Sequence, residues 1–334
     1  MKRRKILSFI GVFLLSLSIN ISCAPSPTGN DIPVRMGYSA WPGWLPWEVA
    51  QQEQLFAANN VAVNLIWFDG YLDSINAMTA GQLDANTQTL NDTIASVAAG
   101  SDQVIVLVND NSTGNDKIIV REGINTVADL RGKSIAVEEG TVDHFLLLLG
   151  LEQAGLTQAD INLQPLETGA AAAAFVAGQV DAVGVFAPFT TQALQRPGSK
   201  ELFSSKDFPG AIPDHLVVSR QLIQNRPEAV QALVNTWFDT VSFMEENPAA
   251  AQQIMAQRAG VSVEDYQSYA EGTQIFTLAD NLKAFTPGND MSSLYYAAER
   301  TSNFLFESGL AKAKPDLTQI FDAQFVKAYA EAQN

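Results

Sequence analysis

The chain has 334 residues, of which 47% are hydrophobic and 17% charged, a composition that argues against disorder and suggests two domains with a core each. Lys and Arg total 20 against 36 Asp and Glu, a formal charge of −16, which excludes the basic face of a nucleic-acid binder. One cysteine excludes an intrachain disulfide, and two histidines leave little room for a metal site. We therefore expect no metal and no cofactor.

Residues 1–22 are predicted to be a signal peptide. Basic residues at 2–5 precede an apolar stretch, from Ile6 to about Ile19, that is too short to span a bilayer stably. The following N-I-S-C resembles a bacterial lipoprotein box in which Cys23 is lipidated, although Asn20 departs from its usual pattern. The alternative is ordinary cleavage nearby, which leaves a free thiol. Residues 23–31 then form a Pro- and Ser-containing tether, and we expect a periplasmic or cell-surface protein anchored by lipid alone.

The chain after the tether alternates strands and helices. Strands are predicted at 34–39, 61–68, 83–87 and 104–108, with helices at 46–60 and 73–82 between them. Pro46 suits the first turn of the first helix. The unbroken aliphatic run at 104–108 suits a strand covered on both faces. This order predicts an α/β fold with a mostly parallel sheet between layers of helices.

The second half repeats the first, with strands at 134–137, 161–166 and 180–186 and helices at 142–155 and 170–179. The segment A-G-Q-L-D-A at 80–85 returns as A-G-Q-V-D-A at 177–182, and Asp69 corresponds to Glu167. We infer an internal duplication and two similar lobes. From 216–219 onward the chain is helix-rich, with helices predicted at 227–246, 248–259 and 290–308.

An exported chain with two α/β lobes, G-Y-S-A-W-P-G-W at 37–44 and two A-G-Q-x-D-A segments resembles the periplasmic substrate-binding proteins of ABC importers. The branch it resembles is the nitrate/sulfonate/taurine/thiamine-precursor group, most strongly at 129–137, 140–145 and 151–156. The resemblance implies a type II-like Venus-flytrap with two crossover segments, near 116–121 and 212–218. Lobe 1 would then comprise 32–117 and 217–334, and lobe 2 would comprise 118–216.

Ligands of open α/β sheets sit beyond the carboxyl ends of the strands, so the candidate site lies in the strand-exit loops. Trp47 and Trp67 are expected in the core. Asp69 and Glu167 hold equivalent places in the two lobes, although Asp69 also suits a helix N-cap. The candidate ligand-binding residues are Ser39, Trp41, Trp44, Asp69, Gln88, Asn111, Glu138, Thr141, Glu167, Phe186 and Asp214.

The charge of these loops leaves two ligand classes open. No Lys or Arg occurs from 36 to 116 or from 134 to 195, whereas acidic and aromatic residues are frequent. Carboxylates with aromatic faces favour a small nitrogen-containing cation, guanidinium above all, and this composition also resembles a guanidine- or urea-associated branch of the family. The alternative is a small anion, such as an aliphatic sulfonate, taurine, nitrate or bicarbonate, held at a helix N-terminus near Gly140 and Thr141.

The resemblance implies passive capture of a solute and delivery to an ABC permease with its ATPase, by a monomer that binds no nucleic acid. A remote alternative is a pyrimidine-precursor enzyme of the same fold, which uses a lysine-bound pyridoxal cofactor and a cysteine-rich iron site. The candidate loops contain no lysine and Cys23 is assigned to the terminus, so we predict that the protein is not an enzyme.

Overall fold

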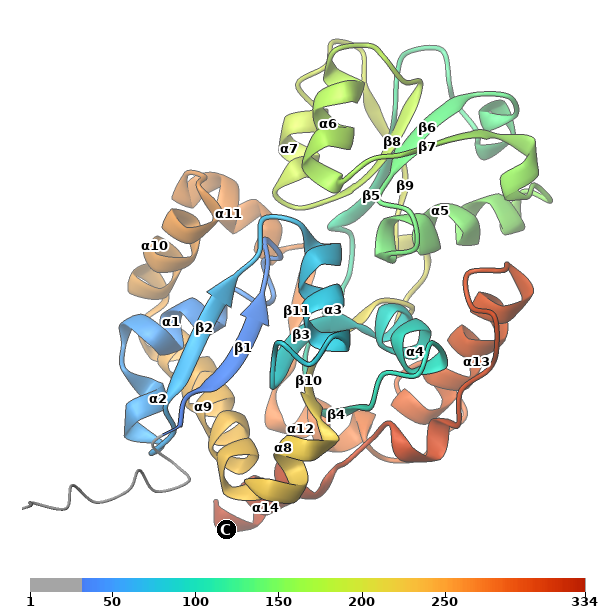
Figure 1. Cartoon of the computed structure of the whole chain (residues 1–334). Coiled ribbons are helices and arrows are strands. Elements are labelled where there is room, and N and C mark those ends of the chain that lie inside the picture. Colours follow the sequence, from blue (N-terminus) through green and yellow to red (C-terminus); the bar gives the residue numbers. More distant parts are fainter. Residues whose placement is uncertain (1–31, 334) are drawn as a thin grey trace, which may run out of the picture.

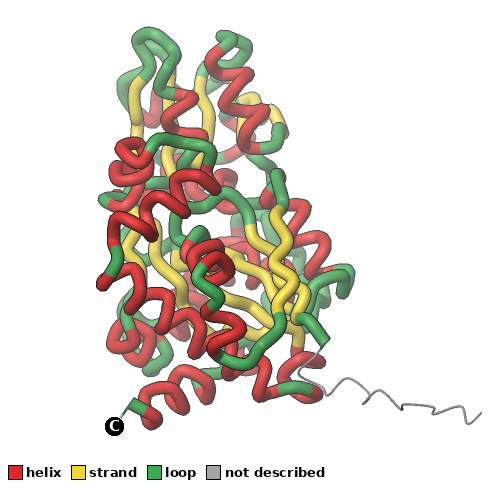
Figure 2. The backbone as a smooth tube through the Cα atoms, turned by 90° about the vertical axis from the view of Figure 1, so that its left-hand side faces the viewer, coloured by secondary structure: helices red, strands yellow, loops and turns green. Residues whose placement is uncertain are grey.

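A computed structural model describes residues 32–333, so the predicted signal peptide and the whole tether, with Cys23, lie outside the described residues. Two β-sheets form two lobes, one above the other in Figure 1, and Figure 2 shows helices flanking the strands of both. The first sheet has the order β11-β4-β10-β3-β1-β2 and the second has the order β7-β6-β8-β5-β9. This is the predicted α/β class.

The strands of the first sheet are β1 (Val34–Tyr38), β2 (Val63–Trp67), β3 (Ala85–Thr89), β4 (Gln103–Ser112), β10 (Pro213–Ser219) and β11 (Thr273–Ile275). Those of the second are β5 (Asp116–Val120), β6 (Ser134–Val137), β7 (Asn162–Pro165), β8 (Ala182–Phe186) and β9 (Lys200–Ser204). If β11 is left aside, the two sheets have the same strand order: β4-β10-β3-β1-β2 in the first corresponds to β9-β5-β8-β6-β7 in the second. In each, one strand, β10 or β5, runs antiparallel to both neighbours.

The helices that pack on the second sheet are α5 (Val142–Gln153), α6 (Thr168–Val176) and α7 (Phe189–Ala193). The first lobe carries α1 (Pro46–Gln52), α2 (Leu55–Ala58), α3 (Tyr71–Thr79), α4 (Leu90–Ala98), α8 (Arg220–Asn225), α9 (Pro227–Glu246), α10 (Pro248–Ala259), α11 (Val263–Ala270), α12 (Leu278–Ala284), α13 (Leu294–Glu307) and α14 (Gln324–Ala332). Among the described residues, no helix is long and apolar enough to cross a membrane.

The repeated hexapeptide has the same structure in both lobes. Gly81 ends the turn after α3 and Gly178 the turn after α6, with φ of 71° and 75°, a left-handed conformation that glycine adopts without steric cost. Each glycine N–H donates to a helix carbonyl at 3.0 Å, and the chain then enters β3 or β8. The aspartates of the two hexapeptides, Asp84 and Asp181, each bind an arginine. This shared geometry agrees with the inferred duplication.

Two short connections join the sheets. Residues 113–115 lead from β4 to β5, and residues 208–212 lead to β10 from a 3₁₀ turn at Ser205–Asp207. The Oγ atoms of Ser112 and Ser205 lie 2.7 Å apart, so the connections are tied side by side. The ranges predicted to cross, 116–121 and 212–218, are instead mostly strand, because the chain enters β5 and β10 as soon as it reaches the other sheet. The division at 117/118 and 216/217 stays a prediction; from here on, lobe 1 and lobe 2 denote the first and the second sheet with the helices that pack on each, so that β10 belongs to lobe 1 and β5 to lobe 2.

Two further predictions are corrected. The helix expected over 46–60 is broken between α1 and α2, where Gln54 has φ of 59°, a conformation that no α-helix contains. Trp67 is only partly buried: its ring packs against the buried Tyr38, with centroids 5.2 Å apart, and the guanidinium of Arg258 lies over it at 3.8 Å. Trp47 is fully buried and stacks on Phe56 with ring centroids 5.9 Å apart, as expected of a core residue.

Candidate ligand-binding site

Four aromatic rings from both lobes meet between the sheets, and we call them the aromatic box. Trp41 and Trp44 lie in the loop after β1, Tyr71 begins α3, and Phe186 ends β8. Phe186 contacts Trp41 and Tyr71 edge-on with centroids 6.2 and 6.4 Å apart, and Trp44 lies 5.1 Å from Tyr71. Pro42 and Gly43 separate the two tryptophans in the chain, and both tryptophan rings line the cavity between the lobes.

The aromatic box surrounds a cavity that both lobes line. Its volume is about 10 Å³, the room of one water molecule. Besides the four rings, the lining residues are Thr89, Asp116, Val142, Ile212 and Asp214. The walls therefore combine aromatic faces with two carboxyl groups, and none of them carries a basic side chain.

Asp110 and Asp214 form a carboxyl pair beside the aromatic box. They are register partners on the adjacent strands β4 and β10, and both are fully buried. The indole N–H of Trp41 donates to Asp110 Oδ1 at 2.9 Å, whereas the oxygens of Asp214 have no N–H or hydroxyl donor among residues 32–333, and their hydrogen-bond partner is the carboxyl group of Asp110, which requires that one of the two carries a proton. Burial first, and then the neighbouring carboxyl charges, raise the pKa of Asp214 well above its usual range, and burial also raises the pKa of Asp110.

A second pair of buried carboxyl groups lies on the lobe 2 side of the cleft. Glu138 follows β6 and Asp143 lies in the first turn of α5, and the Thr168 hydroxyl is 3.1 Å from an oxygen of each. A hydroxyl has one proton, so it donates to only one of the two carboxyl groups at a time. Burial raises the pKa of Glu138 to about 7 and that of Asp143 well above its usual range.

The helix N-termini at the cleft are bound by the protein's own carboxylates. Glu138 Oε1 accepts from the N–H of Leu72 in α3 at 3.4 Å, across the two lobes. Glu167 accepts from two N–H groups of the first turn of α6. The N-termini of α3 and α6, which would attract an anion, therefore already face negative groups.

The structure brings together six of the predicted ligand-binding residues. Trp41, Trp44, Phe186 and Asp214 line the cavity, and Glu138 with Thr141 lies at its lobe 2 edge, where Thr141 Oγ1 donates to the Glu138 carbonyl at 2.9 Å. Ser39 is buried in the same loop as the tryptophans, and its hydroxyl has no partner among the described residues.

Four predicted residues lie elsewhere. Asp69 is exposed and accepts from the Trp67 indole at 2.7 Å, while Gly70 occupies the N-cap of α3. Glu167 is exposed and caps its own helix. Gln88 is buried within lobe 1, where Asn86 donates to it at 3.2 Å. Asp69 and Glu167 are therefore exposed at the rim of the cleft rather than in the cavity, and they approach each other there, since a Cβ atom built at Gly70 would stand 3.8 Å from Glu167 Cγ.

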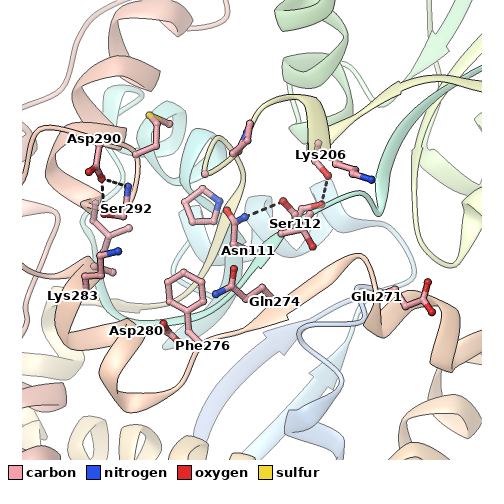
Figure 3. Close-up of a pocket in the computed structure, with 18 residues that line it drawn as sticks. Asn111, Ser112, Lys206, Glu271, Gln274, Phe276, Asp280, Lys283, Asp290 and Ser292 are labelled. Atoms are coloured by element: carbon pink, nitrogen blue, oxygen red, sulfur yellow. Dashed lines mark hydrogen bonds between the residues drawn. The ribbon is translucent and has the colours of Figure 1, made fainter.

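Asn111 lies in a different cavity, behind the two connections. This hinge cavity of about 680 Å³ is open to solvent and is drawn in Figure 3, where Asn111 and Gln274 point into it and Lys206 and Lys283 lie toward opposite ends. Asn111 donates to the Ser112 carbonyl at 3.0 Å. Asn111 follows Asp110 directly in β4. Because consecutive side chains of a strand point to opposite faces, Asn111 points into the hinge cavity while Asp110 faces the cleft.

Sequence reasoning did not select Tyr71, Asp92, Asp110, Asp116 and Asp143 as ligand-site residues. Asp110 and Asp116 flank the turn-rich segment before β5, and Asp92 and Asp143 each stand in a first helical turn, where an acidic residue ordinarily complements the helix dipole. The signal available in the sequence was the run of acidic loops without a basic residue. Among residues 32–333, no group of three or more His, Cys, Asp or Glu is arranged to hold a metal ion.

Solved structures with the same arrangement of lobes define the class of the fold. The alkanesulfonate-binding protein SsuA from Xanthomonas axonopodis pv. citri, bound to MOPS, superposes with a TM-score of 0.74 at 22% identity, covering 87% of this chain and 98% of that one. The protein therefore has the two-lobed periplasmic-binding-protein fold, and the predicted fold class is confirmed.

The chain belongs to the NMT1-like family, whose family model matches residues 28–260. It is 27% identical over 296 residues to the taurine-binding periplasmic protein of Escherichia coli K12, covering 84% of this chain and 89% of that protein. The predicted family of substrate-binding proteins is confirmed, and these relatives favour the sulfonate alternative over a guanidinium ligand. A desulfurization enzyme, DSZB, has the same fold with a TM-score of 0.64 at 19% identity over 90% of this chain and 99% of that one, so the fold alone does not separate binding from catalysis.

Proposed function

We propose that this protein is the solute-binding component of an ABC importer and that it captures a small, planar nitrogen cation of the guanidinium type between its lobes. One observation carries the choice of a cation: buried carboxyl groups with unpaired oxygens meet an aromatic box whose walls contain no basic side chain. Buried carboxylates without positive partners are costly, and a bound cation would remove that cost.

The aromatic box suits this ligand in shape as well as in charge. A guanidinium ion is flat and carries N–H groups around its edge, so it can pair with Asp116 and Asp214 while its face packs on an indole. A cation–π contact contributes about 0.5–2 kcal/mol. The cavity holds about 10 Å³ in this structure, so a ligand larger than a water molecule enters only when the lobes separate.

A small sulfonate is the second candidate, and two observations favour it. The relatives named above bind taurine or alkanesulfonates. In addition, the Ser39 hydroxyl and the Trp44 indole N–H are buried donors without a partner among residues 32–333, and a sulfonate supplies acceptor oxygens. Against this candidate stand the carboxylates on the cleft's helix N-termini, which oppose an anion more strongly as the cleft closes and dries.

Calorimetry against both ligand classes tests the proposal. The protein without residues 1–23, which retains every described residue, is titrated with guanidinium chloride, with sodium chloride as the matched salt, and with taurine, a zwitterion that carries a sulfonate group. We expect heat of binding with guanidinium alone. Binding of taurine without binding of guanidinium would assign the site to sulfonates. At 100 times its Kd, either ligand raises the apparent stability by about 2.7 kcal/mol, which a thermal shift detects independently.

We further propose that the protein is a monomer with no catalytic activity, that an ABC permease and its ATPase are its partners, and that Cys23 carries the lipid that holds it at the periplasmic or outer surface of a membrane. The basis for the anchor is the lipoprotein-like box at 20–23. Metabolic labelling with palmitate tests it: Cys23→Ser should abolish the label, and persistent labelling would contradict the anchor.

A further inference from the structure

Six buried carboxyl groups reach the cleft from opposite lobes. Each is at most 4% exposed. Lobe 1 contributes Asp92 from α4, Asp110 from β4 and Asp214 from β10, and lobe 2 contributes Asp116 from β5, Glu138 and Asp143.

The repulsion between these groups acts across the cleft. Asp116 raises the pKa of Asp214 and of Asp143 through its charge, and Asp92 acts on the same two groups. Asp92 and Asp214 belong to one lobe and Asp116 and Asp143 to the other, so moving the lobes together brings like charges together while it removes them from water. Both effects oppose closure as long as the groups are ionised.

The hydrogen bonds of the cleft are too few to offset this cost. The Thr168 hydroxyl serves Glu138 and Asp143 with a single proton. Oδ2 of Asp110, Oδ2 of Asp116, Oδ1 of Asp143 and both oxygens of Asp214 have no donor among the described residues. The packed arrangement therefore requires added positive charge.

We propose that these six carboxyl groups form an electrostatic gate: when ionised they hold the lobes apart, and the lobes close when a captured cation or bound protons neutralise them. The gate would keep the protein without ligand open at neutral pH. At that pH the lobes would then close only when a positively charged ligand is bound. A ligand shifts the equilibrium toward the closed form only if it binds the closed form more tightly than the open form. In the gate, protons and a cation both meet this condition.

The protonation equilibria give the sign of the effect. Burial raises the pKa of Asp92, Asp116 and Glu138 to about 7, so the closed form binds more protons than an open form with solvated carboxylates, and acid favours closure. The histidines add little positive charge near neutral pH, because burial lowers the pKa of His215 to about 3 and lowers that of His144. The other titratable groups packed around the gate are Tyr71, Asp73, Lys117, Glu167 and Tyr266.

The test measures lobe closure without any solute. The protein without residues 1–23 contains no cysteine, so Asn64→Cys and Gln164→Cys, on the exposed edge strands β2 and β7, give a clean dye pair for energy transfer between the lobes. Small-angle scattering of the unlabelled protein supplies a radius of gyration that depends on no substitution. Both are recorded from pH 8.5 to 5.5.

We expect the closed-to-open ratio to rise at least about tenfold on acidification, since one pKa unit of difference in one group already gives that factor. Asp92→Asn and Asp143→Asn should raise the ratio at pH 8.5, whereas the exposed Glu139→Gln should leave it unchanged. An unchanged ratio in wild type from pH 8.5 to 5.5, or variants that open further, would overturn the gate. Proton-driven closure without guanidinium binding would refute the proposed ligand and leave the gate standing, so the two failures are distinguishable.

Discussion

The indole N–H of Trp41 donates to the carboxyl group of Asp110 at 2.9 Å, and this bond fixes the loop after β1 to the end of β4. Gly43, two residues on, lies directly against the same carboxyl group: a Cβ atom built at Gly43 would stand 2.0 Å from Asp110 Oδ2. The W-P-G-W loop therefore packs around the buried Asp110: Trp41 donates a hydrogen bond to its carboxyl group, and Gly43 leaves the space that the carboxyl group occupies.

Replacing Trp41 by phenylalanine should destabilise the protein and weaken ligand binding. Phenylalanine keeps an aromatic ring but has no N–H, so Asp110 loses a donor while it stays buried, at a cost of about 1–3 kcal/mol. Urea unfolding measures the loss. Trp44→Phe is the matched control, because the Trp44 indole has no hydrogen-bond partner among residues 32–333, and its unfolding free energy should change less. Equal losses in the two variants would contradict the role of the Asp110 bond.

A methyl group at position 43 should push the loop away from Asp110. We expect Gly43→Ala to lower both stability and affinity, because the added carbon and the carboxyl group cannot occupy the same space. In a double-mutant cycle, Gly43→Ala should cost less in the background of Asp110→Ala, where the obstructing group is absent. Additive costs in the cycle would show that another contact is responsible.

Asp214 and Asp69 should differ sharply in their effect on guanidinium binding. Asp214 lines the cavity, and its oxygens have no N–H or hydroxyl donor among residues 32–333, so Asp214→Asn removes a charge-assisted partner worth about 1.5–3 kcal/mol, or at least tenfold in affinity. Asp69 is exposed and bound to Trp67, so Asp69→Asn should leave the Kd within about twofold. Calorimetry decides between them, and a stronger effect at Asp69 would move the site to the rim of the cleft.

Stability without ligand should fall as the pH rises from about 4 to 7. The buried carboxyl groups have raised pKa values, Asp92 and Asp116 to about 7, so in this range the folded protein keeps protons that the unfolded chain releases. Burial lowers the pKa of His215 to about 3, so this residue makes the folded protein more stable as the pH rises. It is a single group, however, and the six buried carboxyl groups have the larger combined effect.

Urea titrations at pH 5.5 and 8 measure this dependence, and urea rather than guanidinium is required because the latter is the proposed ligand. Asp143→Asn should reduce the slope. The carboxylates whose pKa is lowered by arginine, Asp84 and Asp181, lose their contribution only in stronger acid and do not interfere. A stability that rises between pH 5.5 and 8 would contradict the proton uptake.

The sequence by itself determined the α/β class, the two repeated lobes and the family, since these follow from hydrophobic periodicity and from motifs that are local along the chain. The hexapeptides at 80–85 and 177–182 carry their whole structure, a glycine turn between helix and strand, within six residues. The absence of basic residues from the candidate loops likewise indicated the charge of the site in advance.

Only the tertiary structure decided which acids share the cleft. Asp69 and Glu167 looked equivalent because duplication copies local positions, yet both are exposed at the rim of the cleft. Asp110, Asp116 and Asp214 meet because β4, β5 and β10 come together where the chain passes between the sheets. Burial and mutual repulsion depend on distances between residues far apart in sequence. No local pattern encodes those distances, so the cluster could not be assembled from the sequence.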